Sequence, residues 1–210
     1  MSGFAFVIDP PDTELAAMAQ ALAQTCDPHV LDHCERSYQF AAMFARLDGV
    51  VVDDEVLYIG TILHDVGLAL RHRGPDQRFE VRGANEVRTI LLGDGMARDR
   101  AENVWDVIAL HASTAIAAHK SPETAYANRG ISLDVRGGPS ALPEADVRAV
   151  LDRFPRTDFA AAFASTLIDE VRANPATVRL SWMESIAAAH VPEYQRSDFL
   201  ATLHASSGFV

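Results

Sequence analysis

The chain has 210 residues, about half of them apolar, which is enough for one globular domain with a substantial core. Its formal net charge of −11 argues against binding to nucleic acid or an anionic membrane surface and leaves a small molecule as the expected partner. No apolar run is long enough to span a membrane, and the first 35 residues lack the Lys or Arg that begins a secretion signal. We therefore expect a cytoplasmic protein.

Helical periodicity dominates the chain from end to end, because apolar side chains recur every three or four residues. In chain order, helices are expected within residues 13–25, 30–49, 53–70, 79–95, 97–113, 157–175, 176–191 and 196–206. Residues 114–143 are interrupted by Gly and Pro, so we expect a short helix and loops there, before a turn into 143–154. No segment has the alternation of a strand. The predicted fold is all-α, in a single domain.

Five titratable residues stand in apolar surroundings. His64 and Asp65 lie side by side within "LYIGTILHDVGLAL", near an expected helix end. His33 falls on the apolar stripe of the 30–49 helix, His111 ends the run "VWDVIALH", and Asp134 lies in "GISLDVRGG", where an apolar segment turns into a loop. Burying such groups is costly unless each has a partner.

A divalent metal ion accounts for these polar residues together. Imidazole nitrogen and carboxylate oxygen suit a cation of intermediate hardness, with zinc expected first and Fe, Mn or Co as alternatives. The adjacent His64 and Asp65 can both reach one ion when they stand near a helix end. For His33 alone, the ordinary expectation is a core histidine with a hydrogen-bond partner.

The arrangement resembles the HD-domain metal-dependent hydrolase superfamily, in which an upstream His, an adjacent His-Asp pair and a later Asp stand on a helical bundle. The stretch "ILHDVGL" carries the resemblance, which implies that the metal ligands are His33, His64, Asp65 and Asp134. The stretches "HCERSYQFA", "FEVRGANEVRTILL" and "VWDVIALHASTAIAAHKSPETAYANRGISLDVRG" are similar to its cyanamide-hydratase-like branch. The resemblance covers about residues 29–138, the expected metal-binding core, and residues 139–210 are expected to complete one HD-type bundle over 1–210.

The resemblance implies metal-dependent hydration of a small nitrile, cyanamide to urea or a related reaction, by a metal-bound hydroxide. Asp65 would also orient the water. His111 is the candidate proton carrier, and its alternative role is a structural histidine bonded to a backbone carbonyl. Arg36 follows His33 by one turn and would either hold a polar substrate atom or fix Asp65 or Glu80.

The number of metal ions depends on a departure from the wider superfamily. Members with two metals usually carry another His just before a "GA", but here "RFEVRGA" has Phe79 and Glu80 in that place. One metal is therefore expected, and this departure also argues against a di-iron oxygenase. His111 and His119 are left as candidates for a second metal site.

Two other functions compete with hydration. A metal-dependent phosphohydrolase acting on a nucleotide or small phosphate ester is the second candidate, but its pocket would need two or more inward cations. A ligand-binding module without catalysis is the third, and it would predict missing metal ligands. Ala-rich helical surfaces leave self-association into a homo-oligomer open.

Overall fold

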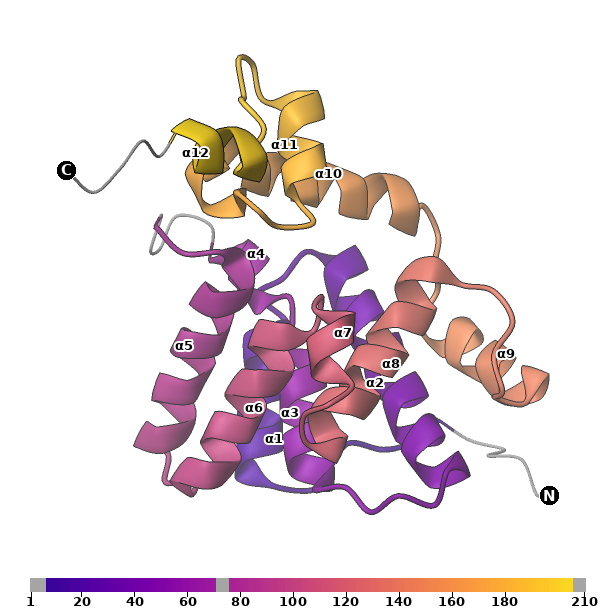
Figure 1. Ribbon diagram of the computed structural model, residues 1–210. Coiled ribbons are helices and arrows are strands. Elements are labelled where there is room, and N and C mark those ends of the chain that lie inside the picture. Colours follow the sequence, from indigo (N-terminus) through magenta and orange to yellow (C-terminus); the bar gives the residue numbers. More distant parts are fainter. Residues whose placement is uncertain (1–6, 71–75, 206–210) are drawn as a thin grey trace.

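The computed structural model describes residues 7–70 and 76–205, and these residues form helices joined by turns and loops (Figure 1). The prediction of an all-α fold is confirmed, and no strand occurs within those ranges. The helices are α1 (Glu14–Ala23), α2 (Pro28–Leu47), α3 (Asp54–Ile62), α4 (Val66–Ala69), α5 (Phe79–Gly93), α6 (Arg98–Leu110), α7 (Thr114–Ala117), α8 (Pro122–Arg136), α9 (Glu144–Arg153), α10 (Phe159–Ala173), η1 (Pro175–Val178), α11 (Glu184–His190) and α12 (Phe199–Ala205).

The pairing of α2 with α8 forms the centre of the fold. α2 is buried along most of its length, which explains why its apolar stripe is so broad. Gly130 of α8 lies against the α2 backbone, where a Cβ atom would stand 2.4 Å from the Ser37 carbonyl oxygen and 2.6 Å from the Ala41 nitrogen. This close approach brings residue 134, one turn later on α8, beside the first turns of α2.

The expected 53–70 helix is divided at its most polar point. α3 begins at the Asp53 cap, whose side chain accepts a hydrogen bond from Val56 N, and it ends before Leu63. A short turn carries His64 and Asp65, and α4 follows. The turn is held because Gly67 packs on the start of α5, where a Cβ atom would overlap the Phe79 carbonyl oxygen.

Two further expectations about local structure were wrong. Residues 114–143, expected to form a short helix and loops, contain the long helix α8, because Ser121 caps it, Pro122 starts it and Gly130 faces α2 instead of breaking the helix. Residues 176–191, expected as one helix, are divided into η1 and α11. Leu180 has a φ of 59°, a left-handed conformation that cannot continue a helix.

The apolar interior has two parts. The larger part lies among α1, α2, α3, α5, α6 and α8. The smaller part joins α4 and the start of α5 to the C-terminal helices through Leu68, Phe79, Leu167, Val171 and Met183. Figure 1 shows α10 and α11 crossing the end of the bundle at which α4 lies. No helix of the described residues is long and apolar enough to cross a membrane.

Candidate metal centre

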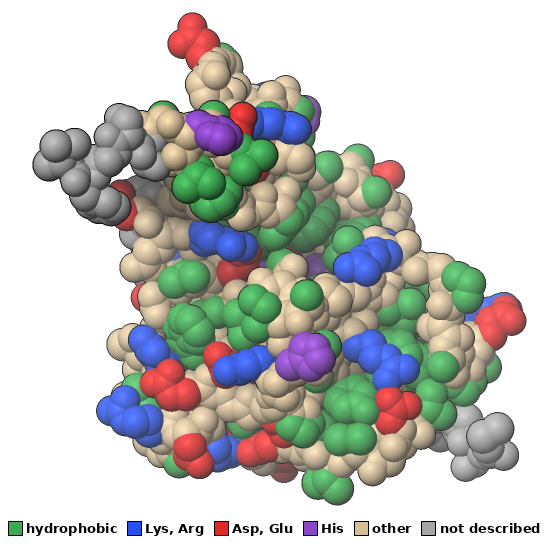
Figure 2. All heavy atoms as spheres, viewed as in Figure 1, with side chains coloured by type: hydrophobic (Ala, Val, Ile, Leu, Met, Phe, Trp, Pro, Cys, Tyr) green, Lys and Arg blue, Asp and Glu red, His purple; other side chains and the backbone are tan. Residues whose placement is uncertain are grey.

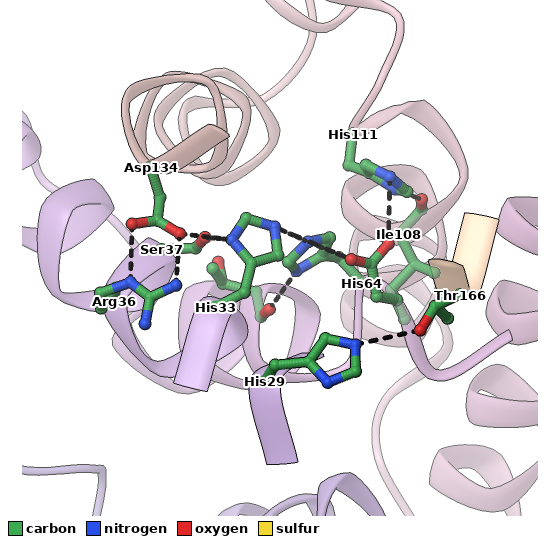
Figure 3. Close-up of polar contacts among 11 residues, drawn as sticks. His29, His33, Arg36, Ser37, His64, Ile108, His111, Asp134 and Thr166 are labelled. Carbon is green, nitrogen blue, oxygen red and sulfur yellow. Dashed lines mark hydrogen bonds and ion pairs between the residues drawn. The ribbon is translucent and has the colours of Figure 1, made fainter. Parts of the chain in front are cut away.

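The turn between α3 and α4 buries His64 and Asp65 at the end of the bundle, beside His33 of α2 (Figure 3). His33 Nε2 and His64 Nε2 are 3.1 Å apart. Oδ2 of Asp65 lies 3.3 Å from His64 Nε2 and 3.7 Å from His33 Nε2. Two donor atoms bound to one zinc ion at about 2.0–2.2 Å stand roughly 3.0–3.6 Å apart, so the three side chains are spaced like ligands of one ion.

The hydrogen-bond partners of His33 and His64 also fit the binding of one metal ion by both rings. His64 Nδ1 lies 2.7 Å from the Thr61 carbonyl oxygen, and His33 Nδ1 lies 2.6 Å from Oδ2 of Asp134. Because both partners accept, each Nδ1 carries a hydrogen, and in the neutral ring each Nε2 then presents a lone pair. Two lone pairs 3.1 Å apart repel each other, and a cation between them removes the repulsion.

Asp65 gives an independent indication. Its Oδ2 atom is buried and has no hydrogen-bond partner among the described residues. Such an orphaned carboxylate oxygen is costly inside a protein unless a charge compensates it. His33, His64 and Asp65 therefore form a group that fits a metal ion in donor type, spacing and protonation.

The electrostatics of the group favour a positive charge next to Asp65. Burial would raise the pKa of Asp65, but the charge of the His64 ring, 3.3 Å away, outweighs it and holds that pKa well below its usual range. Burial would lower the pKa of His64, but the Asp65 carboxylate raises it well above its usual value. Burial lowers the pKa of His33 and His111, and their closeness to His64 lowers it further. A positive charge is thus favoured beside the Asp65 carboxylate, and a bound metal ion would supply it while leaving both Nε2 atoms unprotonated.

Asp134 is brought to the site, but it stands behind His33. Its two oxygens accept from Arg36 Nε at 2.7 Å and Nη2 at 2.9 Å, in addition to the hydrogen bond with His33 Nδ1. Burial would raise the pKa of Asp134, and the bonds from His33 and Arg36 more than offset this and lower it. As placed, Asp134 orients His33, and its predicted role as a direct metal ligand stays a prediction.

Arg36 lies on the far side of Asp134 from the other candidate ligands. It is completely buried, and besides Asp134 it donates to the carbonyl oxygens of Phe154 and Pro155. It does not line the cavity described below. This placement does not suit a contact with substrate. It suits the other expected role, in which Arg36 holds a carboxylate in place, but that carboxylate is Asp134 and not Asp65 or Glu80.

His111 joins the group from the end of α6. Its Nδ1 lies 2.8 Å from the Ile108 carbonyl oxygen, and its Nε2 lies 3.5 Å from Oδ1 of Asp65. Both roles expected for His111, the carbonyl-bonded ring and the group facing the site, are thus compatible with its position. His119, the other candidate for a second metal, is exposed and does not line the cavity.

A cavity of about 320 Å³ opens above these side chains. Its floor is formed by His33, His64, Asp65 and His111, and its walls are Phe79, Ala112, Thr114, Ile131, Ser132, Val135, Arg136, Phe163, Leu167 and Trp182. Figure 2 shows this face of the molecule hollowed between the C-terminal helices and α7–α8, with apolar side chains gathered around the hollow.

The C-terminal part of the wall was not expected from the sequence. Phe163 and Leu167 stand four residues apart on α10, so their helical spacing was the available signal, but it indicates only that they share a face. The Trp182 side chain lines the cavity with 42% of its surface exposed, and its indole N–H donates to Oε1 of Glu80 at 3.2 Å.

In the wider superfamily, proteins with two metals usually carry a further histidine ligand where this chain has Phe79 and Glu80. Both of these side chains have other contacts here. Phe79 forms part of the cavity wall, and its ring centre is 5.7 Å from that of His111. Glu80 is buried and paired with Arg78 and Trp182. The single-metal expectation stays a prediction.

Known proteins share this sequence pattern. The chain is 26% identical over 175 residues to the cyanamide hydratases DDI2 and DDI3 of Saccharomyces cerevisiae, and the match covers 80% of this chain and 78% of each relative. The HD domain family pattern matches residues 30–156, more than half of the chain and every candidate ligand. The chain belongs to the HD domain family.

Proposed function

We propose that the protein is a metal-dependent hydratase that adds water to a nitrile of the cyanamide class and gives a urea or amide. The observation that carries the proposal is the convergence of His33 Nε2, His64 Nε2 and Asp65 Oδ2 at the floor of a mainly apolar cavity. The similarity to two yeast cyanamide hydratases supports the choice of reaction.

A divalent metal held by His33, His64 and Asp65, with zinc expected first, supplies a water of lowered pKa and a Lewis acid. The protein must then keep that site ordered. The Thr61 carbonyl oxygen fixes the His64 ring through a hydrogen bond from His64 Nδ1. Asp134 fixes the His33 ring through the hydrogen bond from His33 Nδ1. Arg36 holds Asp134 from behind with two hydrogen bonds, so the orientation of His33 depends on a fully buried ion pair.

Hydration of a nitrile transfers both hydrogens of the attacking water to the nitrile nitrogen. His111 is placed for this transfer, because its Nδ1–H bond to Ile108 leaves Nε2 free to accept and donate. Burial lowers the pKa of His111, which favours the neutral form of the ring that a proton acceptor needs. Oδ1 of Asp65, 3.5 Å from His111 Nε2, is placed to orient the attacking water toward it.

The charge of the cavity favours a neutral substrate over a phosphate ester. Among the described residues that line it, Arg136 is the sole Lys or Arg. Recognition of a phosphoryl group normally uses several inward cations. Phosphohydrolysis is therefore the second candidate, and it serves as a named outcome of the test.

The test combines metal content with product analysis. We expect about one metal ion per chain by elemental analysis, urea release from cyanamide, and loss of both in His64→Ala. The matched control is His119→Ala, because His119 is exposed and outside the cavity. Release of orthophosphate from phosphate esters without urea formation would replace hydration by phosphohydrolysis. A folded chain that binds no metal after supplementation would overturn the proposal.

A further inference from the structure

The cavity is larger and more apolar than cyanamide requires. Its volume of about 320 Å³ corresponds to roughly ten water molecules, whereas cyanamide has only a few non-hydrogen atoms. Small-molecule sites usually bury most of their ligand's surface. A substrate as small as cyanamide would leave most of this cavity to water.

Aromatic side chains form the wall nearest the metal candidates. The Phe163 ring centre is 5.3 Å from that of His33, and Phe79 approaches His111 on the other side. Trp182 stands edge-on to Phe79 with ring centres 6.5 Å apart. Its indole is fixed by the hydrogen bond to the buried Glu80. A rigid aromatic wall of this kind binds apolar or aromatic groups at little cost in conformational freedom.

The polar groups among the described residues of the wall are few. Thr114 starts α7, and Ser132 and Arg136 belong to α8, whose last turn is exposed at Arg136. Most of the remaining wall is apolar, through Ile131, Val135 and Leu167. The cavity therefore offers a polar floor for the reacting group and an apolar body for a substituent.

We propose that the natural substrate is a nitrile or cyanamide that carries an apolar or aromatic substituent, which packs against Phe79, Phe163 and Trp182. This inference rests on the proposed hydration. In the reaction, the water oxygen bonds to the nitrile carbon and both water hydrogens end on the nitrile nitrogen, so a substituted cyanamide gives a substituted urea. No oxidant, reductant or further reactant is needed.

The first experiment measures kcat/KM of the metal-loaded protein for cyanamide, for N-alkyl cyanamides of increasing length and for N-benzylcyanamide. We expect kcat/KM to rise about fourfold for each methylene group that is buried, which corresponds to about 0.8 kcal/mol. Hydration of cyanamide with equal or lower values for every substituted substrate would overturn the inference and leave the proposed function standing.

The second experiment measures binding without catalysis. The chain has two tryptophans, and Trp105 lies outside the cavity with its indole bonded to Asn85. In the metal-loaded Trp105→Phe variant, the fluorescence therefore reports on Trp182 alone. We expect N-benzylurea to change it saturably, at concentrations at least tenfold below those that urea needs. No change with N-benzylurea would overturn the inference. Binding of N-benzylurea without hydration of any nitrile would support the apolar selection and reject the proposed reaction.

Variants of the wall test its role directly. The ratio of kcat/KM for N-benzylcyanamide to that for cyanamide should fall at least tenfold in Trp182→Ala, and it should stay unchanged in Trp105→Phe, the matched control. Val135→Asn is a second variant of the cavity wall. The fold should tolerate it, because Val135 lines the cavity but is 46% exposed. A ratio that does not move in either wall variant contradicts the proposal.

Discussion

Nδ1 of His33 lies 2.6 Å from Oδ2 of Asp134, although the two residues are 101 positions apart in the chain. The contact joins the first turns of α2 to the last turn of α8 and fixes which nitrogen of His33 faces Asp65 and His64. A carboxylate behind a ligand histidine sets its tautomer and raises its basicity. The strength of the metal centre should therefore depend on Asp134.

Asp134→Asn should weaken metal binding about 10- to 100-fold, because the amide no longer supplies a negative charge to His33. Competition with a chromogenic chelator measures this change in affinity. Asp152→Asn is the matched control, since Asp152 is an exposed acid on α9. Equal affinity in the two variants would show that the contact between Asp134 and His33 does not contribute to metal binding.

Gly130→Ala should lower the free energy of unfolding by about 1–3 kcal/mol, because its methyl group would stand 2.4 Å from the Ser37 carbonyl oxygen and force α2 and α8 apart. Gly93→Ala is the control. Gly93 ends α5 with nothing within 4 Å of an added Cβ, so the substitution should be neutral or stabilising by up to about 1 kcal/mol. Urea denaturation compares the two, and similar effects would show that close packing at Gly130 is unimportant.

Glu170→Ala should destabilise the protein by about 3–5 kcal/mol, since it leaves the buried Arg82 guanidinium without its carboxylate. Nη2 of Arg82 lies 2.8 Å and 2.9 Å from the two oxygens of Glu170 and 3.0 Å from the Gly67 carbonyl oxygen, so the pair ties α10 to α4 and α5.

Glu144→Ala serves as the control for that ion pair. Glu144 is exposed and pairs with Arg148 on the surface of α9, where such pairs contribute little. Thermal or urea unfolding should show a small effect for Glu144→Ala and a large one for Glu170→Ala. A loss below about 1 kcal/mol in Glu170→Ala would mean that the pair does not hold the C-terminal helices in place.

The pH dependence of stability should include a contribution from Glu123. Its carboxylate accepts from Asp53 N and Asn103 Nδ2, both at 2.8 Å, and joins α8 to α3 and α6. Burial would raise the pKa of Glu123, but these hydrogen bonds outweigh it and lower the pKa. Because the folded pKa lies below the unfolded one, the stabilisation is present above about pH 4.3 and is lost as the pH falls through the folded value.

Glu123→Gln should therefore be less stable than the parent by about 1–2 kcal/mol at pH 7, and the difference should shrink as the pH falls below about 4. Urea denaturation over a pH series measures it. Glu144→Gln, at an exposed position, should show no such trend. A difference that stays constant from pH 7 to pH 3 would exclude a contribution from ionised Glu123.

Local pattern was sufficient for much of the fold and for the proposal of a metal site. Helical periodicity depends on neighbours three and four residues apart, so it located most helices, and the paired His64 and Asp65 indicated a metal site in an apolar segment. The sequence pattern predicted helix boundaries wrongly where a tertiary contact overrides the local conformational preference. Gly130 looked like a helix break but packs on α2, and the 53–70 helix is interrupted at the turn that carries the candidate ligands His64 and Asp65.

The sequence by itself indicated an all-helical chain, because helical periodicity depends on short spacings, and the resemblance to HD-domain proteins named His33, His64, Asp65 and Asp134 as candidate ligands of one metal ion. Only the tertiary structure decided that Asp134 and Arg36 stand behind His33 and that His111 faces Asp65. It also decided that α10 and Trp182 close an apolar cavity over the site. Such relationships depend on how distant helices pack, and side-chain periodicity gives the face of each helix but not its partner.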